Sequence, residues 1–195
     1  MRRGYTVGML LMCVSVALAQ SNHTLTLQAQ RVRTKEDAVK TKEAVSLNVR
    51  RDAMKSGMTW YSQPQEVEFI HASQTIEVGV RNLAKASDSC ELQVVFFVED
   101  RETGERKLQH HHKEKLDLLP GIVTKRRVTS PKTRYSRQTM MVDGNKTKMG
   151  SQPYGYIVLL ADNTGPFKWA ASPEVSPVLR TAEDINAVIK EKKLR

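Results

Sequence analysis

The chain has 195 residues, 39% of them hydrophobic, and a formal net charge of +10 at pH 7. This length suits one domain with a sizeable core, because two domains would each be small. The basic balance favours acidic partners such as anionic glycans or membrane surfaces, whereas scattered positive charge also simply keeps a domain soluble. Of the two cysteines, Cys13 lies in an N-terminal apolar run, and Cys90 alone excludes an intrachain disulfide in the rest of the chain.

Residues 1–19 have the three parts of a secretory signal peptide. Arg2 and Arg3 form a basic start, residues 7–18 form a short apolar run, and Ala17-Leu18-Ala19 resembles a cleavage site of small residues. The apolar run is too short to span a membrane as a mature helix. We therefore expect cleavage after Ala19 and an exported protein, periplasmic or extracellular, with no transmembrane segment after cleavage.

The segment that follows the signal peptide is rich in charge. Residues 20–42 interleave basic and acidic side chains, and we interpret them as a charged N-terminal extension in which Leu25–Ala29 alternate as in a short strand. From Ala44 to Val49 apolar and polar residues alternate again. This pattern predicts the first strand of the folded domain, which we place at residues 43–180.

Two apolar strands form the predicted centre of the domain. From Gln74 onward, Ile76, Val78 and Val80 alternate with polar residues, which indicates a strand with one buried face. Leu92–Val98 and Tyr154–Asp162 are instead apolar on both sides, as in strands that are covered on two faces. We expect these two strands to be neighbours whose outward side chains form one patch.

The remaining segments show weaker patterns. The polar run after the turn at Gly104 suits an exposed edge strand, where charge discourages pairing with another chain. The sequence that follows predicts a turn at Pro120-Gly121 and a strand at Ile122–Val128. It then predicts a long loop or loosely held hairpin at Lys132–Gln152 and a final strand at Phe167–Ala171.

The C-terminal residues 181–195 predict an amphipathic helix. Thr181 is a suitable N-cap, and Ile185, Val188 and Ile189 fall on one face. Acidic residues lie near the start and lysines near the end, as the helix dipole favours. We expect this helix to pack on the patch formed by the two apolar strands.

About seven short strands and one terminal helix predict an all-β protein, an immunoglobulin-like (Ig-like) β-sandwich with a C-terminal α-helix. The pattern over about residues 74–172 resembles bacterial Ig-like domains of the CARDB and fibronectin-III kind, through Val78-Gly-Val-Arg-Asn-Leu, Val94-Val-Phe-Phe-Val, Leu118-Leu-Pro-Gly and Gly155-Tyr-Ile-Val. The chain is also similar to small secreted Ig-like proteins that accompany pilus and secretion machinery in Gram-negative bacteria. Both resemblances imply binding or scaffolding rather than catalysis.

Three consecutive histidines stand out in the polar strand. His110 and His112 share one strand face, so they are the candidate metal ligands if a third ligand such as His71 or Glu114 comes near. The alternative is a solvated edge strand, and we predict no bound metal and no cofactor. A small periplasmic hydrolase that uses these histidines is the rival function, but no nucleophile motif supports it and we predict no catalytic residue.

The predicted binding residues form two groups. The first is the outward patch of the apolar strands, wherever the C-terminal helix leaves it uncovered, and the second is a basic run: Val95, Phe97, Ile157 and Leu159, then Lys125, Arg126 and Arg127. Depending on the register of the strands, Tyr156, Val158 and Leu160 take the place of Ile157 and Leu159 in the patch. We expect the partner to be another protein or an anionic cell-surface polymer, and not nucleic acid. A carbohydrate-binding module remains an alternative that needs a row of exposed aromatic residues.

Overall fold

The computed structural model describes residues 25–32, 38–51, 59–137, 140–142 and 145–194. Its elements in chain order are β1 (Leu25–Val32), β2 (Ala38–Arg51), β3 (Thr59–Ala72), β4 (Thr75–Asn82), β5 (Asp88–Asp100), β6 (Arg106–Leu118), β7 (Val123–Thr129), β8 (Thr133–Ser136), β9 (Met140–Val142), β10 (Asn145–Thr147), β11 (Ser151–Asp162), β12 (Gly165–Ala171), the 3₁₀ helix η1 (Ser176–Val178), α1 (Ala182–Glu191) and β13 (Lys193–Leu194). The prediction of an all-β protein with one short C-terminal helix is confirmed.

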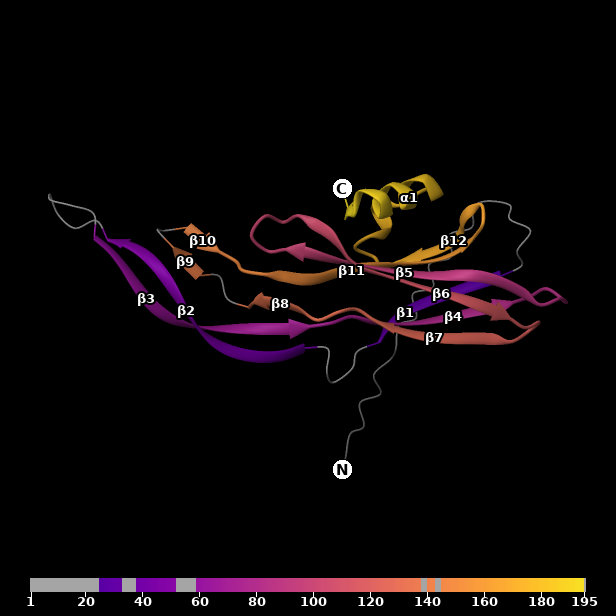
Figure 1. Ribbon diagram of the computed structural model, residues 1–195, viewed down its shortest axis with the longest axis horizontal. Coiled ribbons are helices and arrows are strands. Elements are labelled where there is room, and N and C mark those ends of the chain that lie inside the picture. Colours follow the sequence, from indigo (N-terminus) through magenta and orange to yellow (C-terminus); the bar gives the residue numbers. More distant parts are fainter. Residues whose placement is uncertain (1–24, 33–37, 52–58, 138–139, 143–144, 195) are drawn as a thin grey trace, which may run out of the picture.

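Two antiparallel sheets pack face to face in the body of the molecule. One sheet has the strand order β1-β4-β7 and the other has the order β12-β11-β5-β6-β13. Ile76, Val78 and Val80 of β4 pack in one core cluster with residues of β5 and β11 such as Phe96 and Val158, and all of these side chains are fully buried. Figure 1 shows the two sheets as layers, with α1 over the outer face of the larger sheet.

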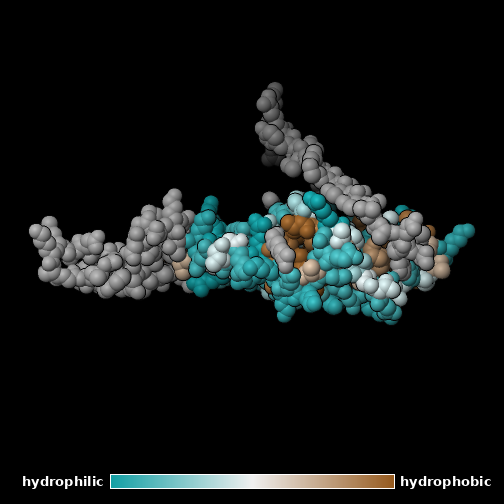
Figure 2. Space-filling model, turned by 90° about the horizontal axis from the view of Figure 1, so that it is seen from above, coloured by the Kyte–Doolittle hydropathy of each residue, from teal (hydrophilic) through white to brown (hydrophobic). Residues whose placement is uncertain are grey.

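The two strands predicted to be apolar on both faces are neighbours. In the β5–β11 register, Val95 lies opposite Ile157 and Val94 lies opposite Val158. The residues that point away from the smaller sheet belong to a second core cluster, which also contains Ile185 of α1. The helix therefore covers the outer face of the larger sheet, as we expected from its apolar stripe. Seen from the side that carries α1, the described surface is mostly hydrophilic, with hydrophobic residues gathered in a small area (Figure 2).

Helix α1 begins and ends for local reasons. The Thr181 side chain accepts a hydrogen bond from the Asp184 N–H, and the Asp184 carboxylate accepts one from the Thr181 N–H, which forms a capping box. Backbone hydrogen bonds from Arg180 and Thr181 lower the pKa of Asp184. The helix ends where Lys192 adopts a left-handed conformation, and β13 then pairs with Arg106 and Lys107 of β6.

Strand β1 lies within the segment that the sequence predicts to be a charged extension. Strand β1 pairs with β4 from Leu25↔Asn82 to Val32↔Thr75, and Leu25 is only 2% exposed. The segment that we interpreted as an N-terminal extension therefore contributes an edge strand to the smaller sheet. An edge strand with one buried face needs few apolar residues, so its signal is weak within a charged segment.

The strand predicted at Ala44–Val49 belongs to a hairpin outside the two packed sheets. β2 pairs with β3 along fourteen residue pairs, and the C-terminal end of β3 pairs with β8. Figure 1 shows this hairpin extending away from the body. The segment 132–152, predicted as a loop or a hairpin, contains β8 and the paired strands β9 and β10.

Gly155 allows the chain after β12 to pack closely against β11. A Cβ atom at this position would lie 2.5 Å from Ser172 Oγ and 2.6 Å from Val175 Cγ2. The Ser172 N–H donates to the Tyr156 carbonyl oxygen at 3.0 Å, and the Tyr156 N–H donates to Ser172 Oγ at 3.2 Å. These contacts direct residues 172–179 across the outer face of the larger sheet toward α1.

We predict that Gly155→Ala lowers the free energy of unfolding by about 1–3 kcal/mol, because the added methyl group forces Ser172 and Val175 to move. Gly79→Ala is the matched control, since its Cβ would meet Val123 Cγ1 at an ordinary 3.7 Å. That variant should stay within about 0.5 kcal/mol of the wild-type protein in urea unfolding. Equal stability of the two variants would contradict this account of Gly155.

Candidate functional site

Asn82 organises one end of the two packed sheets. Its side chain is fully buried, and its Nδ2 donates to the carbonyl oxygens of Ala86 at 2.9 Å and Leu118 at 3.1 Å. Its Oδ1 accepts from the Ala84 N–H at 2.9 Å, and its backbone oxygen accepts from the Gly121 N–H at 2.8 Å. One buried amide thus joins the loop after β4 to the loop after β6. This end of the body lies away from the β2–β3 hairpin (Figure 1).

Large aliphatic side chains project from these joined loops into solvent. Four of the five large hydrophobic residues that are exposed in the described part of the chain lie here, with 47–56% of each exposed: Leu83, Leu119, Ile122 and Val123. We call these four residues the apolar end. Ile122 N–H donates to the Leu119 carbonyl oxygen at 3.4 Å, and Val123 lies opposite Arg81 in the β4–β7 register. Gly121 supplies the turn with a φ of 71°.

Basic residues lie beside the apolar end. Arg81 lies opposite Val123 in the β4–β7 register, Lys85 lies in the loop after β4, and Lys125 follows Val123 by two residues. All three are exposed, and in the described residues none of them forms an ion pair. The acidic residues nearest to them in sequence are Glu77, which pairs with Arg127, Asp88, which is half-buried, and Asp117, which is exposed. We call Arg81, Lys85 and Lys125 the basic rim.

The predicted basic run on β7 is partly neutralised. Arg126 Nε lies 2.6 Å from Glu114 Oε1 of β6, and Arg127 Nη2 lies 3.2 Å from Glu77 Oε2 of β4. The hydrogen bond from Arg126 lowers the pKa of Glu114. Arg126 thereby links the two sheets across their open edge, so only Lys125 of the three offers its charge fully to solvent.

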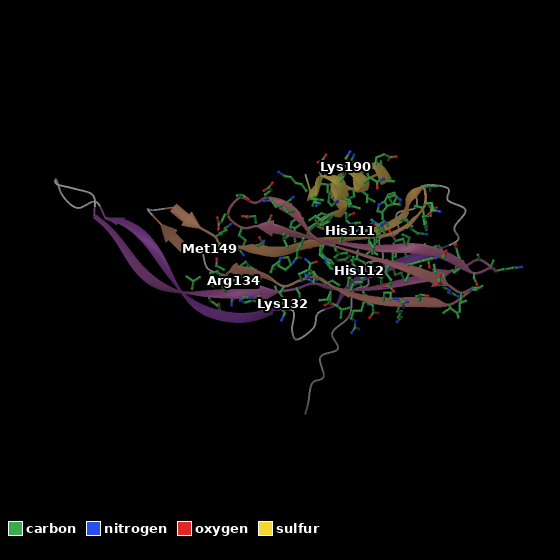
Figure 3. All side chains as sticks on the ribbon, in the orientation of Figure 1. His111, His112, Lys132, Arg134, Met149 and Lys190 are labelled. Atoms are coloured by element: carbon green, nitrogen blue, oxygen red, sulfur yellow. The ribbon has the colours of Figure 1, made fainter. Side chains whose placement is uncertain are left out.

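Arg134, a basic residue that follows β7 in sequence, lies away from this run. Arg134 lies over the ring of Phe69, with 3.9 Å between its Cζ and the ring centroid. Figure 3 shows Arg134 near Met149, toward the β2–β3 hairpin, and apart from His111 and His112. Arg134 therefore does not continue the basic rim.

The four predicted apolar contact residues are buried beneath α1. Val95, Phe97, Ile157 and Leu159 are each at most 1% exposed, and they pack with α1 in one cluster. They offer no surface to a partner while the helix is docked. Their apolar character reflects the need to be covered on both faces of the sheet.

The histidines of β6 point to opposite sides of the strand. His111 Nε2 lies 2.7 Å from Gln93 Oε1, whereas His112 Nε2 lies 3.6 Å from Glu114 Oε2. The ring of His110 stacks near Phe96, with 6.3 Å between the centroids. None of these partners is a hydroxyl or a thiol. Within the described ranges, no three His, Cys, Asp or Glu residues are grouped so that they could hold a metal ion.

Cys90 behaves as a core residue. It is 5% exposed, and burial, with a smaller effect from Asp88, raises the pKa of its thiol to about 11. Because the thiolate is the reactive form, this thiol is poorly suited to nucleophilic attack or to disulfide formation with another chain.

Comparison with known proteins identified no relative: no protein-family model, curated protein or solved structure matches the chain. In the part of the chain that the structure describes, no helix has both the length and the apolar character needed to cross a membrane.

The environment of His111 predicts a pH-dependent stability. Burial and the nearby Lys113 lower the pKa of His111, so the folded protein favours the neutral ring. Because the folded state favours the neutral ring, His111 adds to the free energy of unfolding at pH values above its unfolded pKa of about 6.5. This contribution is lost as the pH falls through the lower pKa that His111 has in the folded protein. Between about pH 7.5 and pH 5, His111→Gln should therefore lose less stability than the wild-type protein.

Urea unfolding at several pH values measures this difference. Gln at position 111 keeps a polar partner for Gln93, and His112→Gln serves as the control on the opposite face of β6. Identical pH dependence in the wild-type and His111→Gln proteins would show that His111 does not contribute in this way.

Proposed function

We propose that the protein is an exported, non-catalytic binding or scaffolding protein with an Ig-like domain, acting in a cell-envelope or pilus-associated assembly through its apolar end. The observation that carries this proposal is the exposure of Leu83, Leu119, Ile122 and Val123 on loops that the Asn82 side chain holds together. The leader-like residues 1–19 support the export part of the proposal.

The strand order supports an Ig-like assignment. Ig-type sandwiches place the first, second and fifth strands, A, B and E, in one sheet and strands C, F and G in the other. Here β1, β4 and β7 correspond to the first set, while β5, β11 and β12 correspond to the second. The β2–β3 hairpin and the strands β8–β10 are then insertions between sandwich strands.

The energetics of the apolar end favour a binding role. Each large aliphatic side chain left in water forgoes about 1.5–3 kcal/mol of burial energy, and the fold has no need of these residues in its core. Contiguous exposed apolar residues on a soluble domain commonly mark interaction sites. Because the Asn82 hydrogen bonds hold both loops, little conformational entropy is lost when a partner binds.

The histidines and Cys90 give less support to a catalytic function. The contacts of the three histidines lack a nucleophile, and Cys90 is buried with a raised pKa. The basic rim agrees with the acidic partner that the net charge favours.

Site-specific photo-crosslinking in the native host tests this proposal. A photoreactive amino acid at Ile122 should form crosslinks that Leu119→Ser reduces by about tenfold or more, because loss of one large aliphatic contact costs roughly 1.5–3 kcal/mol. The control position is Val178, which is 39% exposed on η1 and is separate from the apolar end. Absence of crosslinks from Ile122 to either protein or lipid, or equal crosslinking from Val178, would contradict a binding role for this end.

A further inference from the structure

We infer that the apolar end docks on an anionic lipid surface, with its aliphatic side chains entering the interface and its basic rim contacting the headgroups. This inference rests on the proposed binding function and names its partner. It is carried by the chemistry of the two loops, by the charges around them and by the place where the N-terminal segment joins the sheet.

The composition of the loops suits lipid better than protein. The residues at 83–87 and 119–123 are Leu-Ala-Lys-Ala-Ser and Leu-Pro-Gly-Ile-Val, which include no aromatic residue and no arginine. Residues that dominate the affinity of protein–protein interfaces are enriched in Trp, Tyr and Arg, whereas Leu and Val are under-represented. A lipid surface accepts aliphatic as well as aromatic side chains, which enter about 5–10 Å into the headgroup and acyl boundary next to Lys and Arg.

The charges near these loops complement anionic headgroups. Arg81, Lys85 and Lys125 are exposed beside the aliphatic side chains, and of the acidic residues near them Glu77 is paired with Arg127, which leaves Asp88 and Asp117. Attraction between basic side chains and an anionic lipid surface acts within about 8 Å at physiological salt. An apolar centre with a cationic rim can therefore gain both apolar burial and electrostatic attraction when it lies flat on such a surface.

Only six residues of the sequence separate the N-terminal apolar run from the first residue of β1. Leu25 is the first residue of β1 and lies opposite Asn82, so the N-terminal segment joins the sheet at the apolar end. The apolar run ends at Leu18, and the chain from Leu18 to Leu25 spans at most about 25 Å even when fully extended. A signal peptide held in a membrane during export would therefore keep the apolar end within about 25 Å of that membrane.

Co-sedimentation with lipid vesicles tests the inference, using protein purified from its native host. The wild-type protein should sediment with vesicles of phosphatidylcholine containing about one-third phosphatidylglycerol, and less with pure phosphatidylcholine. The double variant Leu119→Ser/Ile122→Ser should bind the anionic vesicles about tenfold or more weakly. Lys85→Gln/Lys125→Gln should weaken binding to the anionic vesicles. Added salt should also weaken the binding of the wild-type protein to these vesicles.

Val178→Ser is the matched control, because it removes an exposed aliphatic side chain from a different surface and should leave vesicle binding unchanged. Circular dichroism checks that each variant is folded. If the double variant fails to fold, Ile122→Trp provides a second measurement, since its fluorescence should shift to shorter wavelength and be quenched by brominated lipid on vesicle binding.

Three results would overturn the inference. Equal vesicle binding by the wild-type and Leu119→Ser/Ile122→Ser proteins would exclude the apolar end as the lipid contact. Crosslinks from Ile122 to a protein, without vesicle binding, would leave the proposed binding function intact but would assign this end to a protein partner. Self-association that the double variant abolishes, again without vesicle binding, would assign it to a second copy of the chain.

Discussion

The structure depends on one constraint: strands β5 and β11 carry large apolar side chains on both faces. Phe96 and Val158 pack toward the sheet β1-β4-β7, while Phe97 and Ile157 pack toward α1. Neither face can be left in water, because each such side chain would forgo about 1.5–3 kcal/mol of burial energy. The smaller sheet and the C-terminal segment therefore cover the two sides of the larger sheet.

This arrangement leaves the ends of the two packed sheets and the outer face of the smaller sheet exposed to solvent. Both faces of the larger sheet are used for packing, and Arg126 and Glu114 form an ion pair across the open edge between β7 and β6. At one end the buried Asn82 holds two loops together and exposes aliphatic side chains there. Rigid sheets that present loops at their ends are a common way to support a binding surface.

The sequence predicts the parts of the structure that have strong local patterns. The continuous apolar runs identify β5 and β11, and the spacing of Ile185 and Val188 identifies the helix and its docking face. The place of β1 was not predicted, since three alternating apolar residues in a charged segment say little about long-range pairing. The apolar end was also missed: Leu118 and Leu119 look alike in sequence, yet the first is 1% exposed and the second 55%. The alternation Leu116-Asp117-Leu118 places Leu118 on the buried face of β6, whereas Leu119 follows the strand and is exposed at the turn that Gly121 and the hydrogen bonds of Asn82 form.

The most direct test of this account is truncation after Arg180, which removes α1 and β13. The truncated protein should expose Val95, Phe97, Ile157 and Leu159, and should bind a hydrophobic dye, associate or aggregate. Its free energy of unfolding should fall by about 2–5 kcal/mol, as for the loss of a large buried side chain or more. A truncated protein that remains monomeric, binds no dye and unfolds at the wild-type urea concentration would contradict the claim that the two-faced strands require the helix.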